Sequence, residues 1–188
     1  MKQPAASWSV PPRGVPVRTP LHPGRLLART CLAPLSLNQS EAARLLARYR
    51  QWLGGGGLLI GVDLVKPVAV LEAAYDDALG VTAAFNLNLL NHLNRLLGAD
   101  FRVRDWRHVA LFNAADSRIE MHLEARSAQR VAWPGGERAF AAGERIHTEN
   151  SYKWAPASFA ALLRDAGFSR VRHWADAQGW FGVWLVAG

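Results

Sequence analysis

The sequence predicts an α/β fold in which one sheet is interrupted by a large insertion. The expected elements follow the order helix, strand, a long middle block over residues 67–150, then a helix and two strands. Half of the 188 residues are hydrophobic, and eight of them are tryptophans, so the chain is long and apolar enough to bury a core.

The first regular segment predicts one αβ unit of a parallel sheet. Asn38 and Glu41 have the spacing of a capping box, helical periodicity follows, and Gly54 is expected to end the helix. Leu58 to Leu64 is a continuous apolar run that predicts a buried strand. Asp63 therefore lies at the carboxyl end of that strand, where ligands bind in parallel sheets.

The rest of the chain predicts an inserted α+β block and a return to the sheet. Pro67 begins a helical segment that breaks near Gly80. Alternating strands, a hairpin turn at Pro134 to Gly136, a helix over residues 158–167 and two strands around a turn at residues 177–179 follow. We therefore expect one domain from residues 37–66 and 151–188, and an inserted domain from 67–150, with a ligand cleft between them.

The first 36 residues differ from the rest in composition. They hold seven of the ten prolines and no acidic residue, and their basic residues are Lys2, Arg13, Arg18, Arg25 and Arg29. A disordered tail and a transit peptide are both open interpretations. Most of the net charge of +7 thus belongs to this segment, and no basic stripe with interleaved aromatic residues follows it, which argues against a nucleic-acid-binding protein.

Several other classes are disfavoured. The single Cys31 excludes a disulfide framework and a cysteine-based zinc site within this sequence. No apolar run reaches the length of a membrane span, so we expect a soluble, cytoplasmic protein without a membrane partner. We also expect a monomer. Histidines 92, 108, 122, 147 and 173 show no metal-ligand spacing, and the sequence predicts no metal site.

The segment GERIHTENSYK, Gly143 to Lys153, carries an unusual density of polar side chains between two apolar stretches. A core strand could not bury so many polar groups without partners. Because the segment lies where the chain returns from the insertion to the sheet, we expect these side chains to face the rim of the cleft.

Three motifs in order, residues 74–101 (AYDDALGVTAAFNLNLLNHLNRLLGADF), 117–123 (SRIEMHL) and 143–154 (GERIHTENSYKW), resemble the histidine-specific, S-adenosylmethionine-dependent methyltransferases of ergothioneine biosynthesis. The resemblance covers about residues 38–188. It implies a Rossmann-like class I methyltransferase sheet with an inserted α+β substrate-binding cap. It also implies transfer of three methyl groups from S-adenosylmethionine to the α-amine of L-histidine, which gives hercynine.

The same resemblance implies a set of substrate-binding residues. Glu149 and Ser151 correspond to the positions that bind the imidazole, Tyr75 to the tyrosine that positions the amino-acid end, and Phe85 and Met121 to apolar positions lining the pocket. Without the resemblance, Tyr75 would be an ordinary helix-face residue, Phe85 and Met121 would be core residues, and Asp76 and Asp77 would be solvated. Glu149 could also form a surface ion pair with Arg145 or Lys153.

The chain also departs from the family pattern. The family's glycine-rich cofactor loop has no counterpart before residue 38, and its Gly-Asn pair corresponds to Leu35 and Ser36. We therefore expect a truncated form of the sheet, marginal stability and absent or very weak binding of S-adenosylmethionine. One hypothesis is that residues 1–36 are read out of frame or from a misplaced start. A non-catalytic histidine- or imidazole-binding fragment is the alternative function.

Overall fold

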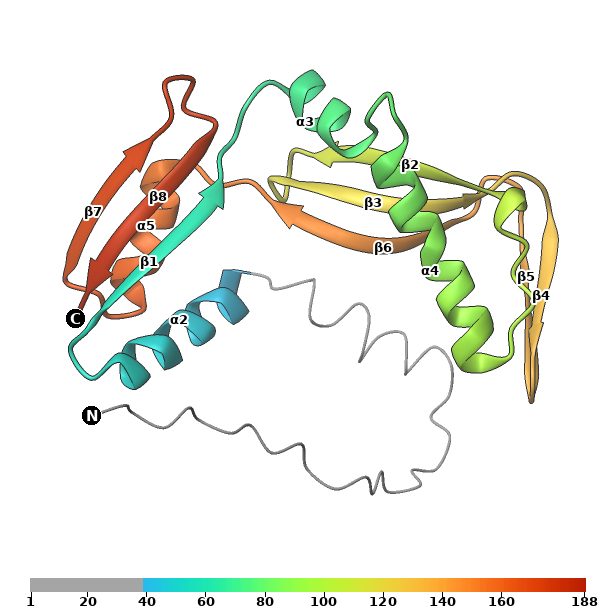
Figure 1. The fold of residues 1–188 in the computed structure, drawn as a ribbon, viewed down its shortest axis with the longest axis horizontal. Coiled ribbons are helices and arrows are strands. Elements are labelled where there is room, and N and C mark those ends of the chain that lie inside the picture. Colours follow the sequence, from blue (N-terminus) through green and yellow to red (C-terminus); the bar gives the residue numbers. More distant parts are fainter. Residues whose placement is uncertain (1–38) are drawn as a thin grey trace, which may run out of the picture.

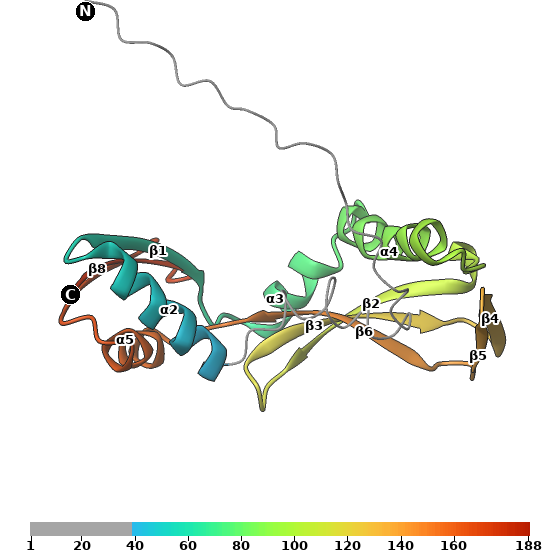
Figure 2. The same cartoon turned by 90° about the horizontal axis from the view of Figure 1, so that it is seen from below.

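The computed structural model describes residues 39–188 as two three-stranded sheets, each covered by helices on one face (Figures 1 and 2). The interpretations given above to residues 1–36 lie outside the described residues. The α/β class is confirmed, and the elements follow the predicted order. The division into domains stays a prediction; strand β6 runs across its boundary at residue 150.

The first sheet holds the two ends of the described chain. Helices α2 and α5 cover one of its faces (Figure 2). Aromatic and aliphatic side chains fill the space between, among them Leu46, Phe159, Leu163 and Trp184. The elements of this sheet, in the order β1-β8-β7, are β1 (Gly57–Asp63), β8 (Phe181–Ala187) and β7 (Arg170–Ala175), with α2 (Gln39–Leu53) and α5 (Pro156–Asp165).

Strand β1 differs from its prediction in two respects. Within residues 39–188 it pairs with β8, and this pairing is antiparallel. The strand is also not buried on both faces: exposure alternates along it, and Leu59 is 66% exposed. The apolar run of residues 58–64 predicted a parallel, doubly covered strand, but among the described elements helices cover only one face.

The second sheet contains the central part of the inserted block. Its strands run antiparallel in the order β2-β3-β6, and helices α3 and α4 lie on one face (Figure 2). A separate hairpin, β4-β5, turns at Pro134 and Gly135 as predicted. The elements are α3 (Val68–Tyr75), α4 (Val81–Leu97), the short 3₁₀ helix η2 (Val103–Asp105), β2 (Trp106–Asn113), β3 (Arg118–Ala125), β4 (Gln129–Trp133), β5 (Gly136–Phe140) and β6 (Arg145–Tyr152).

The predicted break between α3 and α4 is confirmed, and Asp77 helps to form it. Gly80 has a left-handed φ of 70°, which favours glycine. The Asp77 carboxylate accepts the backbone N–H groups of Thr82 and Val81 at 2.8 and 3.0 Å, and these bonds lower its pKa to about 2. Asp77 is therefore a cap for α4 rather than only a solvated residue. None of the described helices is long and apolar enough to cross a membrane.

A β-bulge in β6 decides which side chains face the helices. Met121 pairs with Glu149, but the next residue of β3, His122, pairs with His147. Thr148 is the extra residue, and its buried hydroxyl donates to the Met121 carbonyl at 2.9 Å. Because one inserted residue reverses the alternation of faces, Glu149 and Ser151 lie on the helix-covered face and His147 on the opposite one.

The two sheets meet where β1 and β6 end. Leu64 forms an isolated parallel bridge with Trp154, and the Trp154 N–H donates to the Asp63 carbonyl at 3.0 Å. The end of the GERIHTENSYK motif therefore lies at the return from the insertion to the first sheet, as predicted. This junction places the Asp63 side chain next to Lys153.

The close packing of Trp184 against Gly182 provides a test of the first sheet. A Cβ added at Gly182 would lie 2.3 Å from the Trp184 ring. We expect Gly182→Ala to lower the free energy of unfolding by about 3 kcal/mol, because overpacking forces the buried ring from its position. The measurement is chemical unfolding followed by circular dichroism. Gly57→Ala, whose added Cβ would stay 3.3 Å or more from its neighbours, is the control; equal effects of both variants would contradict this packing.

Candidate functional site

Lys153 lies at the centre of a polar network that joins the two sheets. Its side chain is 0% exposed, and its ammonium lies 2.9 Å from Asp63 Oδ2. It also donates to Tyr75 Oη and Ser151 Oγ, each at 2.9 Å. The three N–H donors of the ammonium thus meet three acceptors, which is the condition for burying such a charge.

The hydroxyl groups of Tyr75 and Ser151 lie 2.6 Å apart, and we call them the hydroxyl pair. Each of the two oxygens accepts a hydrogen bond from Lys153. The bond between the two hydroxyl groups is formed by the hydrogen of one of them. The other hydroxyl hydrogen remains available to a ligand. The hydroxyl pair can therefore donate one hydrogen bond to a ligand, and the buried ammonium of Lys153 fixes the position of both hydroxyl groups.

Asp63 is the counterion of this network. Burial acts to raise the pKa of Asp63, but hydrogen bonds from Lys66 and Lys153 outweigh it and hold the pKa below its ordinary value. Lys66 Nζ lies 2.5 Å from Oδ1, while Lys153 takes Oδ2. The carboxylate is therefore ionised and bound on both oxygens at neutral pH.

The backbone around Tyr75 is fixed by strand β2. His108 Nε2 lies 2.7 Å from the Tyr75 carbonyl, and the Asn86 amide lies 2.9 Å from His108 Nδ1. Because the amide nitrogen donates to Nδ1, Nε2 carries the proton and donates to Tyr75. The adjacent Leu71 packs on Ile119, with Tyr75 against the same cluster. These contacts hold the Tyr75 hydroxyl over the second sheet.

Glu149 and Met121 are neighbours on the same face. They are cross-strand partners, and Met121 is buried at 3% exposure in the cluster against which Tyr75 packs. Burial raises the pKa of the Glu149 carboxyl above its ordinary value, and the attraction of Lys153 offsets only part of this effect. Regular alternation places Glu149 and Ser151 on one side of β6, so the carboxylate and the hydroxyl pair face the same space.

Phe85 occupies a different environment. It lies on α4 and is 70% exposed, and the hydrophobic clusters of residues 39–188 do not include it. The structure thus brings together Tyr75, Met121, Glu149 and Ser151 but leaves Phe85 outside their contacts. The substrate-binding roles of all five stay predictions.

A cavity of about 360 Å³ lies beside the network, between α2 and the ends of β1 and β6. Asp63 and Ser151 line it, and most of its remaining walls are apolar or aromatic, among them Leu46, Tyr49, Trp154 and Phe159. This volume and this mixture of apolar walls with few polar groups are typical of small-molecule sites.

The sequence interpretation missed the role of Lys153. It considered this residue only as a surface ion-pair partner of Glu149, whereas the structure buries it against Asp63. A signal was present, because Glu149, Ser151 and Lys153 are spaced two residues apart and Asp63 had been placed at a ligand-binding strand end. The missing information was the junction that sets the end of β1 beside the end of β6.

Comparison with known proteins gives consistent matches over the same segment. The family model of histidine-specific, S-adenosylmethionine-dependent methyltransferases matches residues 35–187. The histidine N-alpha-methyltransferases of Mycolicibacterium smegmatis and Mycobacterium tuberculosis are 50% and 48% identical over 70% and 71% of this chain. Ergothioneine biosynthesis protein 1 of Neurospora crassa is 30% identical over 81% of this chain and 17% of its own length.

The chain spans 42% of the length of each of the two mycobacterial relatives. The family match covers most of the chain and all the residues of the polar network, from Asp63 to Lys153. The chain belongs to the family of histidine-specific, S-adenosylmethionine-dependent methyltransferases.

Proposed function

We propose that this chain supplies the histidine-recognising part of an enzyme that methylates the α-amine of L-histidine to hercynine in ergothioneine biosynthesis. The observation that carries the proposal is the half-buried Glu149 carboxylate on the same strand face as the hydroxyl pair, which buried Lys153 orients. Family membership and the names of the relatives support the choice of substrate and pathway.

The donors and acceptors of this site match a neutral imidazole. Such a ring has one N–H group and one nitrogen with a lone pair. The Glu149 carboxylate can accept the ring N–H, and the available hydroxyl hydrogen of the hydroxyl pair can be donated to the other nitrogen. An apolar amino acid would leave the half-buried carboxylate unpaired, and this cost favours histidine.

The contribution of these residues to the reaction is positioning. S-adenosylmethionine, when bound, supplies an electrophilic methyl group on a sulfonium. The histidine amine must lose its proton and be held in line with that methyl group, and a fixed imidazole restricts the amine to few positions. We propose that Tyr75, anchored through its carbonyl to His108 and through its hydroxyl to Lys153, fixes the amino-acid end.

The residues described do not provide an identifiable cradle for S-adenosylmethionine. In Rossmann-like folds a glycine-rich loop leads from a strand into a helix. Within residues 39–188, the glycine run Gly54–Gly57 leads instead from helix α2 into strand β1. None of the residues 39–188 is therefore assigned to the cofactor. We further propose that the β1-β8-β7 sheet is part of a Rossmann-like sheet and that residues 67–150 form the substrate cap.

The test of the proposed function is methyl transfer measured by mass spectrometry. The purified chain is incubated with S-adenosylmethionine and L-histidine, and the products are compared with authentic hercynine. Formation of mono-, di- and trimethylated histidine supports the full activity. Histidine binding without product supports the non-catalytic binding fragment instead, and methylation of other amino acids at equal rates contradicts the proposed specificity.

A further inference from the structure

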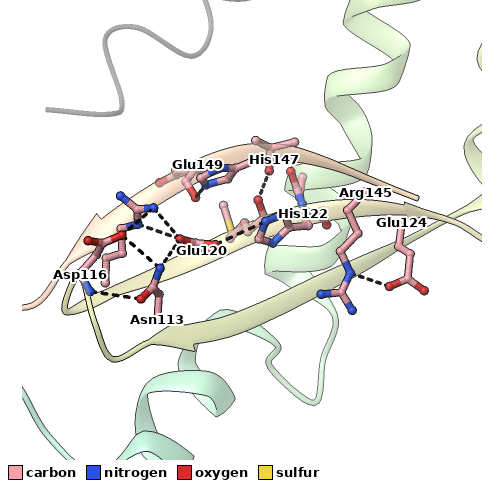
Figure 3. Close-up of polar contacts among 12 residues, drawn as sticks. Asn113, Asp116, Glu120, His122, Glu124, Arg145, His147 and Glu149 are labelled. Carbon is pink, nitrogen blue, oxygen red and sulfur yellow. Dashed lines mark hydrogen bonds and ion pairs between the residues drawn. The ribbon is translucent and has the colours of Figure 1, made fainter. Parts of the chain in front are cut away.

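We propose that Glu120, His122 and His147 form a binding site for a divalent transition metal of the zinc class. One ligand atom from each residue lies within 4.8 Å of the others. Figure 3 shows Glu120, His122 and His147 close together on strands β3 and β6, and the strand register places them on the face of the second sheet opposite the hydroxyl pair. Two imidazoles and one carboxylate are a common donor set for Zn²⁺ with an open fourth position.

The strand pairing produces this cluster. Glu120 and His122 are two residues apart on β3 and therefore share a face. The bulge at Thr148 then places His147 directly across from His122, and the two rings stack with centroids 4.7 Å apart. Without the bulge, His147 would lie on the helix-covered face. For this reason the sequence spacing of the histidines gave no sign of a metal site.

The buried imidazole of His122 lacks good hydrogen-bond partners among the described residues. The residue is 8% exposed, and its Nδ1 has no hydrogen-bond partner among the described residues. Its Nε2 lies 3.5 Å from Glu120 Oε2, which is too long for a good hydrogen bond. Neither ring nitrogen therefore has a good hydrogen-bond partner within residues 39–188, and a metal ion bound to one of them would satisfy that nitrogen.

The other two ligands are oriented by neighbouring groups. Glu120 Oε1 accepts hydrogen bonds from Arg118 at 2.6 and 2.8 Å and from Asn113 at 2.9 Å, and Oε2 is the oxygen nearer to His122. His147 Nε2 lies 3.1 Å from the Glu149 carbonyl, so this nitrogen carries the proton and Nδ1 offers its lone pair. Such outer contacts are typical of metal-binding carboxylates and histidines.

The positive charges near the cluster are themselves paired. Arg118 contacts Asp116 at 3.1 Å as well as Glu120, and Arg145 contacts Glu124 at 2.7 Å. Figure 3 shows these ion pairs on either side of the two histidines. The repulsion between the arginines and a bound cation is therefore reduced by two further carboxylates.

The experiment is calorimetric titration of the metal-stripped full chain with Zn²⁺, repeated with Co²⁺ and visible absorption to report imidazole coordination. We expect one saturable site in the wild type, and His147→Ala and Glu120→Gln each to raise Kd by about 100-fold or more, since even outer-contact changes cost 10–100-fold. His92→Ala, at an exposed position on α4, is the matched control and should leave Kd unchanged.

Circular dichroism of each variant verifies folding before titration. Zinc should also raise the Tm of the wild type and of His92→Ala but not that of His147→Ala, because a ligand that binds only the folded state stabilises it. No saturable binding to the folded wild type, or equal Kd values for His147→Ala and wild type, would overturn the proposal. Neither the Kd nor the Tm measurement depends on methyl transfer, so a negative result for the metal site would not contradict the proposed function.

Discussion

Lys153→Met is expected to lower the free energy of unfolding by about 3 kcal/mol and to weaken L-histidine binding at least about 10-fold. Breaking a buried ion pair leaves an uncompensated charge and unpaired hydroxyls. The expected loss is at the lower end of the range for such pairs, because Asp63 is 32% exposed and keeps Lys66 as a partner. Chemical unfolding and calorimetric titration measure the two effects.

Lys66→Met is the matched control for this prediction. It removes the other lysine from the same Asp63 carboxylate but leaves the contacts of Lys153 with the hydroxyl pair intact. We expect it to destabilise the chain less and to leave histidine affinity nearly unchanged. If both lysine variants weakened histidine binding equally, the charge of the region rather than the orientation of the hydroxyl pair would account for recognition.

Glu149→Gln is expected to weaken histidine binding about 10-fold while making the ligand-free chain more stable at neutral pH. The amide can still accept the ring N–H, but a hydrogen bond to a charged group exceeds a neutral one by about 1–2 kcal/mol. Lys153→Met is expected to destabilise the chain, whereas Glu149→Gln is expected to stabilise it. The difference arises because the Glu149 carboxylate serves binding and destabilises the folded chain.

The pH dependence follows from the direction of the Glu149 shift. Burial raises the pKa of Glu149 in the folded chain above its unfolded value. Between the two values the folded state holds the proton more tightly, so the free energy of unfolding falls as pH rises. At a pH above both pKa values, the cost of burying the ionised carboxylate is fully present, and the Glu149→Gln substitution removes it. Thermal unfolding at acidic and neutral pH should therefore show a difference between variant and wild type that grows with pH.

Glu137→Gln is the control for this second prediction. Glu137 forms an exposed ion pair with Arg130, and its side chain is 53% exposed, so its neutralisation should change stability little. A Glu149→Gln variant that is less stable than the wild type at neutral pH would show that the carboxylate has a stabilising partner in the folded chain.

The elements with clear local signals could be predicted from the sequence. Gly54 ends helix α2, Gly80 lies at the break between α3 and α4, and the turn at Pro134 and Gly135 forms a hairpin. Each of these depends on the backbone preferences of a few neighbouring residues. The exposure of β1 was not predictable in the same way, since it depends on which distant elements cover each face.

In the candidate site, too, some features could be predicted from the sequence, whereas others depend on distant contacts. The resemblance selected Tyr75, Met121, Glu149 and Ser151, and the structure places them together, but the burial of Lys153 depends on a contact with Asp63 across the junction. The Glu120–His122–His147 cluster depends on a single bulge that shifts the pairing of β3 and β6. Contacts between residues far apart in sequence, and the register of strands, have no signature in spacing alone.

The most direct test of the central claim is calorimetric titration of the wild-type chain with L-histidine and, separately, L-phenylalanine, each with and without S-adenosylmethionine. The account predicts saturable binding of histidine and none of phenylalanine, because only an imidazole pairs with both Glu149 and the hydroxyl pair. Equal binding of the two amino acids, or no binding of histidine to the folded chain under either condition, would contradict it.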